Sequence, residues 1–214
     1  SEVQNHFIPL VLRLAGGDWF TSRVSSVNLM YGIYQRAGPL KEKIRQKFIE
    51  LCSEETPMIR RAIASKIGHL AMYVEKEIVV GEFIPIFKQL SSDEQDSVRV
   101  LCLDSLNLLE KILTKDENRT HSLPIIIAAT EDKSWRIRLA LAKNFSQLAE
   151  ALGKEITDTS LIQIFTTLLK DGENDVRNGA VISFSAFIHN ISTEKLQVLV
   201  PQIQTLARDK YGPV

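Results

Sequence analysis

Apolar residues recur along the chain at intervals of four, four, three and four positions. This spacing places all five side chains of each set on one face of an α-helix. We call each set an apolar stripe. The four stripes are Ile59, Ile63, Ile67, Leu70 and Val74; Val98, Cys102, Leu106, Leu109 and Leu113; Ile137, Leu141, Phe145, Leu148 and Leu152; and Val176, Ala180, Phe184, Phe187 and Ile191.

Polar residues in the turns before these helices repeat with the same period. An Asp and an Arg, six residues apart, recur at steps of 39 residues in the pairs Asp93/Arg99, Asp132/Arg138 and Asp171/Arg177. A fixed period of this length is typical of stacked helical repeats, in which each copy is one supersecondary unit. The period predicts an all-α protein, an α-solenoid of about five antiparallel helix pairs.

The expected repeats cover about 5–38, 41–79, 80–118, 119–156 and 157–194, with a partial copy at 195–214. Both ends fall within the array, and neither carries the polar capping repeat of a complete solenoid. We therefore expect a single solenoid, 1–214, that is a fragment of a longer array.

The first copy follows the pattern poorly. Its stripe would consist of Ser22, Ser26, Met30, Ile33 and Ala37, and a shifted face with Val24, Val27, Tyr31 and Tyr34 is an open alternative. The expected first helices of the third and fourth copies are 83–90 and 123–129.

Composition narrows the class of partner and the compartment. Lys and Arg number 26, as do Asp and Glu, which argues against nucleic acid as the main partner. The two cysteines, Cys52 and Cys102, lie at apolar positions of helical patterns and are expected to be buried free thiols. No apolar run approaches the roughly 18 residues of a membrane span. We expect a cytoplasmic protein without membrane contact, with a nuclear location as a second option.

Catalytic patterns are missing from the sequence. The four histidines, His6, His69, His121 and His189, stand apart from one another, and no glycine-rich phosphate loop or nucleophile motif occurs. The carboxylates follow the repeat instead of forming an acid/base pair. We expect a protein that is not an enzyme and uses no cofactor or metal.

The repeated turn residues have a structural interpretation. We expect the Asp of each pair to cap the second helix by accepting free N–H groups, and the Arg to reach a neighbouring turn. Stacked copies would then form a ladder of Asp93, Arg99, Asp132, Arg138, Asp171 and Arg177.

The residues between the repeated pair differ from turn to turn, and this difference points to recognition. Trp19-Phe20, Pro57-Met58, Glu94-Gln95 and Trp135-Arg136 occupy corresponding turns, where the backbone must lie near the surface. Trp and Arg in such a place are common anchors of protein interfaces. The alternative is that each Trp folds back over its own repeat.

Four of these turns resemble those of a known family, the HEAT-repeat scaffolding A subunits of protein phosphatase 2A. The matching stretches are 14–23 (LAGGDWFTSR), 56–62 (TPMIRRA), 92–99 (SDEQDSVR) and 131–138 (EDKSWRIR). They are more specific than the general pattern of helical repeats. The helix bodies depart from the family pattern, for example at 31–34 and 104–107.

The resemblance implies a non-catalytic scaffold that binds a regulatory B-type subunit through its intra-repeat turns. The catalytic subunit would dock on repeats outside this segment. The implied contacts are Trp19, Phe20, Glu55, Met58, Glu94 and Trp135, with Pro57, Arg61 and Arg136 shaping or joining the same surface. The alternative is another HEAT-repeat adaptor, such as a nuclear-transport or nucleic-acid-associated scaffold.

Overall fold

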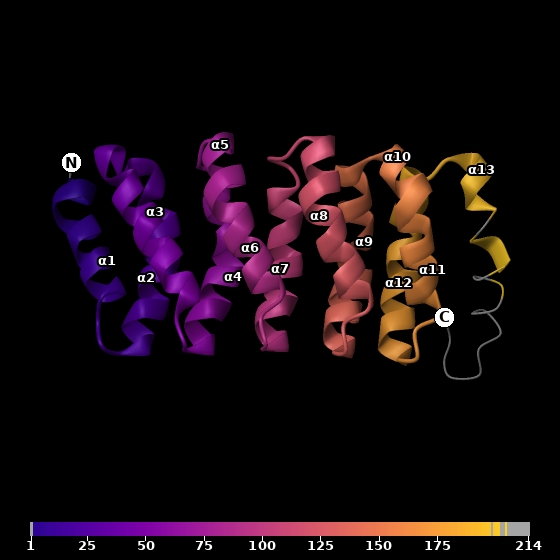
Figure 1. Cartoon of the computed structure of the whole chain (residues 1–214), viewed down its shortest axis with the longest axis horizontal. Coiled ribbons are helices and arrows are strands. Elements are labelled where there is room, and N and C mark those ends of the chain that lie inside the picture. Colours follow the sequence, from indigo (N-terminus) through magenta and orange to yellow (C-terminus); the bar gives the residue numbers. More distant parts are fainter. Residues whose placement is uncertain (1, 198, 202–203, 205–214) are drawn as a thin grey trace. The chain divides into compact units, whose positions relative to one another are not determined.

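The computed structural model describes residues 2–197, 199–201 and 204 and divides the chain into two compact units. Unit 1 comprises Ser1–Ile112 and unit 2 comprises Leu113–Val214. None of the described residues lies in a β-strand, so the predicted all-α class is confirmed. In Figure 1 the helices of each unit lie side by side in the order of the sequence.

Unit 1 consists of paired helices. The helices α1 and α2 form one pair, the segment from α3 to η4 contacts α4 through η4, and the segment from α5 to α6 pairs with α7. Short 3-10 segments (η2 to η4) and π-helical turns (η1 and η5) extend or join them. The elements are η1 (Val3–Phe7), α1 (Ile8–Ala15), α2 (Phe20–Ile33), η2 (Tyr34–Arg36), η3 (Gly38–Leu40), α3 (Lys41–Glu50), η4 (Leu51–Ser53), α4 (Pro57–Ala71), α5 (Lys76–Ile78), η5 (Val79–Phe83), α6 (Ile84–Ser91) and α7 (Asp96–Leu109).

Unit 2 repeats the arrangement. The helix α8 packs against α9, and the segment from α10 to α11 packs against α12, while α9 and α12 lie against each other. The elements are α8 (Lys115–Thr130), α9 (Trp135–Leu152), α10 (Lys154–Ile156), η6 (Thr157–Leu161), α11 (Ile162–Leu169), α12 (Asn174–Phe187), η7 (Ile188–Asn190) and α13 (Thr193–Leu196). The expected partial copy at 195–214 lies largely outside the described residues.

The apolar stripes form the cores of both units. Every stripe residue of α4, α7 and α9 is buried, and in the last stripe all but Phe184 are buried. Phe145 is fully buried, with its ring centroid 5.1 Å from those of Phe165 and Phe187. The first copy combines both expected faces. Its buried residues are Ser26, Met30 and Ala37 from one face and Val27 and Tyr34 from the other.

The first helices of the third and fourth copies begin earlier than predicted. The segment preceding α6 is already helical from Lys76, because the π-helical turn η5 joins α5 to α6 immediately before Pro85. The helix α8 starts at Lys115 and continues through Pro124. The predicted 83–90 covers α6 but omits the helical turns before it, and the predicted start at 123 lies well inside α8.

The contact between α4 and α7 shows how closely the second helices approach each other. A Cβ atom on Gly68 would lie 2.7 Å from the carbonyl oxygen of Ser105, so a larger residue would push the helices apart. The hydroxyl of Ser105 donates to the carbonyl oxygen of Ala64 at 2.5 Å. This close packing fixes where the turns preceding the two helices stand.

Candidate partner-binding surface on the intra-repeat turns

The repeated aspartates shape the turns through short backbone contacts. The Oδ1 atom of Asp93 accepts the N–H of Gln95 at 2.9 Å, and Asp132 and Asp171 accept in the same way from the residue two positions later, at 2.8 and 2.9 Å. Each donor is the residue immediately before the helix, and the helices themselves receive no side-chain cap. The predicted cap is therefore corrected to a turn held by Asp and its own backbone.

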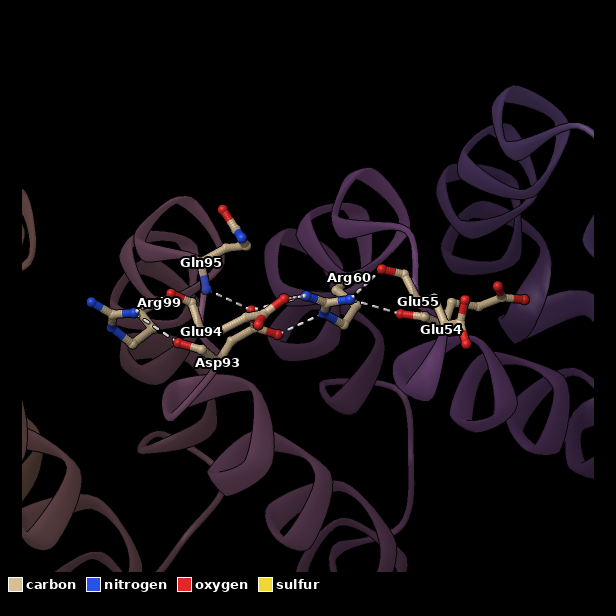
Figure 2. Close-up of polar contacts among 7 residues, drawn as sticks. All are labelled: Glu54, Glu55, Arg60, Asp93, Glu94, Gln95 and Arg99. Atoms are coloured by element: carbon tan, nitrogen blue, oxygen red, sulfur yellow. Dashed lines mark hydrogen bonds and ion pairs between the residues drawn. The ribbon is translucent and has the colours of Figure 1, made fainter.

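The repeated arginines hold the same turns from the other side. The Nη1 atom of Arg60 donates to the carbonyl oxygens of Glu54 and Glu55 at 2.9 and 2.7 Å, as Figure 2 shows. Arg99 makes the equivalent bonds to Asp93 and Glu94. In unit 2, Arg138 and Arg177 bind the carbonyl oxygens of Asp132 and Asp171, and in the first turn Arg23 binds those of Gly17 and Asp18.

Within each unit, one arginine also reaches the aspartate of the following turn. Arg60 donates from Nε and Nη2 to the two carboxylate oxygens of Asp93 at 2.6 and 3.2 Å (Figure 2). Arg138 does the same to Asp171 at 2.6 and 3.0 Å. Such bidentate pairs are strong and restrict geometry. We call these two ion pairs, with the turn bonds that accompany them, the turn ladder.

The ladder residues are largely buried, and their protonation reflects the pairing. The hydrogen bond to Asp93 raises the pKa of Arg60, and that to Asp171 raises the pKa of Arg138. Burial alone would raise the pKa of Asp171, but the hydrogen bonds from Arg138 and from the N–H of Glu173 outweigh it and lower that pKa below its ordinary value. The pair of Arg138 and Asp171 is therefore charged throughout the neutral range.

The outer side of the turns in unit 1 exposes large apolar side chains. Trp19 is 78% exposed, Met58 47% and Phe20 42%. Pro57 is half-buried at the first position of α4, where it fixes the entry of the helix. Exposed charged residues accompany them, namely Glu55, Arg61 and Glu94.

The corresponding turn of unit 2 is arranged differently. Trp135 is half-buried, and the guanidinium carbon of Arg136 lies 4.9 Å from the centre of its ring. This is a cation–π contact between neighbours. Trp135 thus partly follows the alternative in which the ring folds onto its own repeat, whereas Trp19 does not.

The sequence places Arg60 and Arg23 in the repeat frame, but the predicted ladder omitted both residues. Arg60 makes the ladder contact of unit 1, and its position, 39 residues before Arg99, was the available signal. Arg23 lies 3.5 Å from a carboxylate oxygen of Glu54. In that pair the carboxylate of Glu54 stands where other turns have an Asp, so a search for repeated Asp residues could not reveal the pair.

Metal-binding and thiol groups can be surveyed in the described part of the chain. The part of the chain that the structure describes contains no cluster of three or more His, Cys, Asp or Glu side chains able to hold a metal ion. Both cysteines are buried free thiols, as predicted, and burial raises the pKa of Cys52 to about 12. None of the described helices is long and apolar enough to cross a membrane.

Several proteins similar to this chain are named as regulatory A or scaffold subunits of protein phosphatase 2A. The chain is 42% identical over 213 residues to the human 65 kDa regulatory A subunit, beta isoform, of serine/threonine-protein phosphatase 2A, covering 97% of this chain and 35% of that protein. It is 40% identical to the regulatory A subunit of protein phosphatase PP2A of Schizosaccharomyces pombe, covering 73% and 27%, and 40% identical to the protein phosphatase 2A scaffold subunit of Dictyostelium discoideum, covering 80% and 30%. The chain thus spans about a third of the length of these relatives.

Solved structures support the fold class. The crystal structure of Cex1p matches with a TM-score of 0.77 at 16% identity, over 97% of this chain and 41% of that one. A designed armadillo repeat protein matches with a TM-score of 0.56 at 15% identity, over 94% and 92%. Both likenesses concern the fold alone, and they confirm the predicted α-solenoid.

The family comparison covers most of the chain. A family model described as PIK3R4-like, middle domain, matches residues 75–207. The chain therefore belongs to the PIK3R4-like, middle domain family, and it looks like a fragment of a regulatory A-type scaffold of protein phosphatase 2A, which is what its turn sequences predict.

Proposed function

We propose that this chain is part of a non-catalytic scaffold of protein phosphatase 2A and that its intra-repeat turns bind a regulatory B-type subunit. The relatives are named as regulatory A or scaffold subunits, and these names support the scaffold role. The catalytic subunit would bind outside this segment. We place the protein in the cytoplasm, and its repeats at the boundaries that the period predicts.

The observation that carries the binding proposal is the exposure of Trp19. A tryptophan that is 78% exposed contributes little to its own fold, whereas burial of such a ring in an interface is worth about 2 kcal/mol or more. Phe20 and Met58 are also exposed on turns of the same unit. Arg23 and Arg60 bind the backbone carbonyl oxygens of these two turns and hold them in place, so a partner would meet a preorganised surface.

The chemistry of the described residues supports a role without catalysis. Both thiols are buried and protonated at neutral pH, and the carboxylates of Asp93 and Asp171 are paired with arginines of the ladder. A residue that hydrolyses or transfers a group must be accessible and near its partners in a pocket. Asp93, Asp132 and Asp171 hold turns in place instead.

A pull-down from cell extract with two matched double variants tests this function. Wild type, Trp19→Ala/Trp135→Ala and Met72→Ala/Ile182→Ala would be immobilised, and captured proteins identified by mass spectrometry. Met72 and Ile182 are also large exposed apolar residues, but they lie outside the intra-repeat turns. Circular dichroism would verify equal helical content of the three proteins.

We expect a phosphatase regulatory subunit with wild type and with the Met72/Ile182 variant, and its loss with the tryptophan variant. Equal capture by all three proteins would refute the role of the turns. Capture of nuclear-transport factors in place of phosphatase subunits would favour the alternative adaptor function instead.

A further inference from the structure

A groove in unit 1 lies between α1 and α3, which pack side by side in Figure 1. Its volume is about 480 Å³. Leu12 and Arg13 of α1 form one wall, and α3 supplies the other with Lys43, Gln46, Lys47 and Glu50. None of these residues belongs to the turn surface proposed above.

The helices around this groove carry more basic than acidic residues. Residues 3–17, which include α1, contain no acidic residue, and α3 has four basic residues against two acidic ones. The corresponding first helices elsewhere lack such an excess. Residues 76–91 carry two basic and two acidic residues, as does α8. Among the first helices, the basic excess is therefore confined to α1 and α3, whereas among the second helices α4 also has three basic residues and no acidic one.

Most of the basic side chains near the groove already have partners. Lys47 pairs with Glu50 at 2.7 Å, Arg45 pairs with Glu82 at 2.8 Å, and Lys41 lies 5.4 Å from the ring centre of Tyr34. Arg13 and Lys43 differ, because neither forms an ion pair with any residue in the described part of unit 1. Both are exposed, and they stand on opposite walls of the groove.

We propose that the α1/α3 groove binds an acidic peptide segment of a partner protein. Two carboxylates of the segment would pair with Arg13 and Lys43, and one apolar side chain would lie against Leu12. Charge complementarity carries this choice of partner, because a groove with two unpaired cations on opposite walls attracts and orients a chain of carboxylates.

A short acidic peptide fits these observations better than a nucleic acid does. Binding to a phosphate backbone needs a wide basic surface with many contacts, whereas this site offers two free cations and an apolar residue. The proposal also stands apart from the proposed function, since the groove uses α1 and α3 and not Trp19 or Trp135.

Fluorescence anisotropy with a labelled probe tests the proposal on the whole chain. The probe is a fluorescein-labelled nonapeptide of Glu and Asp with two Leu residues, compared with the same peptide in which Gly replaces Leu. The test variant is Arg13→Glu/Lys43→Glu. The control is Lys133→Glu/Lys170→Glu, which makes the same charge change at exposed sites of unit 2.

We expect roughly tenfold or greater weakening with the groove variant and less than about twofold with the control. Binding should also weaken between about 50 and about 300 mM salt, and the Gly peptide should bind less tightly than the Leu peptide. Equal binding by the two variants would overturn the proposal. So would equally tight, competing binding of a single-stranded DNA nonamer, because that result would reveal a general polyanion surface.

Discussion

The two sides of the intra-repeat turns differ in how strictly their residues repeat. We call the side that carries the turn ladder the inner side and the side that carries the exposed residues the outer side. On the inner side, Arg60–Asp93 in unit 1 and Arg138–Asp171 in unit 2 share the same shortest contact of 2.6 Å. On the outer side, the corresponding positions carry different residues with different exposure. The repeated bonds of the turn ladder fix the backbone of the turns, so the outer side chains can vary without altering the fold.

Phe145→Ala should have the largest effect, because it removes the core that supports the turns of unit 2. The Phe145 ring is fully buried against Phe165 and Phe187, and such truncations cost about 3 to 5 kcal/mol. Urea denaturation followed by circular dichroism measures this loss. The control Ile182→Ala, at a side chain that is 76% exposed, should stay within about 0.5 kcal/mol.

A small change in the stability of the Phe145 variant would contradict the packing described for α9. It would also weaken the claim that the apolar stripe, and not the turn, supplies most of the stability.

Asp171→Asn removes the carboxylate charge from one of the two ion pairs of the turn ladder. The variant keeps the size of the side chain but leaves the largely buried guanidinium of Arg138 without its charged partner, which should cost about 2 to 3 kcal/mol. The control Asp175→Asn lies four residues away on α12 and is exposed. Equal urea midpoints for the two variants would show that the ladder contributes nothing to stability.

Much of the turn ladder and of the apolar core could be predicted from the sequence, because both depend on the spacing of residues along the chain. Phe145 and its stripe partners follow the helical period, and their burial was predicted correctly. The helix starts were missed because the π-helical turn η5 precedes Pro85, and because α8 continues through Pro124. A proline alone does not reveal whether the preceding turn will adjust to it.

The outer side and the groove were harder to predict, because they depend on side chains meeting in space. Trp19 and Trp135 occupy corresponding turns, yet only Trp135 has an arginine over its ring. Arg13 and Lys43 come from two helices separated by a whole helix, α2, in the chain. The absence of acidic residues from 3–17 was the one sequence signal for the groove.

Trp19→Ala tests the outer side. Because Trp19 is highly exposed, the free energy of unfolding should change by less than about 0.5 kcal/mol. Binding to a regulatory B-type subunit should weaken by about 2 kcal/mol. Denaturation and titration calorimetry measure the two quantities separately. A large loss of stability would show that the Trp19 ring stabilises the fold and does not belong to the freely varying outer side.

The pH dependence of stability distinguishes the charged inner side from the rest of unit 2. The pKa of Asp171 is lowered in the folded state, so its contribution is fully present above about pH 4, the ordinary carboxyl range. It is lost as the pH falls through the lowered, folded-state pKa. Urea midpoints of wild type and Asp171→Asn should therefore converge as the pH falls below about 4. A gap that stays constant in acid would contradict the ion pair.

Arg136→Ala should have the smallest effect on stability. It tests why Trp135 is half-buried while Trp19 is exposed. Removal of the guanidinium takes away a cation–π contact worth about 0.5 to 1 kcal/mol at an exposed site. Trp135 should become more exposed, so its fluorescence emission should move to longer wavelength in a Trp19→Phe background. In that background the emission of Trp135 is observed alone, because the chain has two tryptophans. An unchanged emission would mean that Arg136 does not shield the ring, and that the half-burial of Trp135 comes from its own repeat.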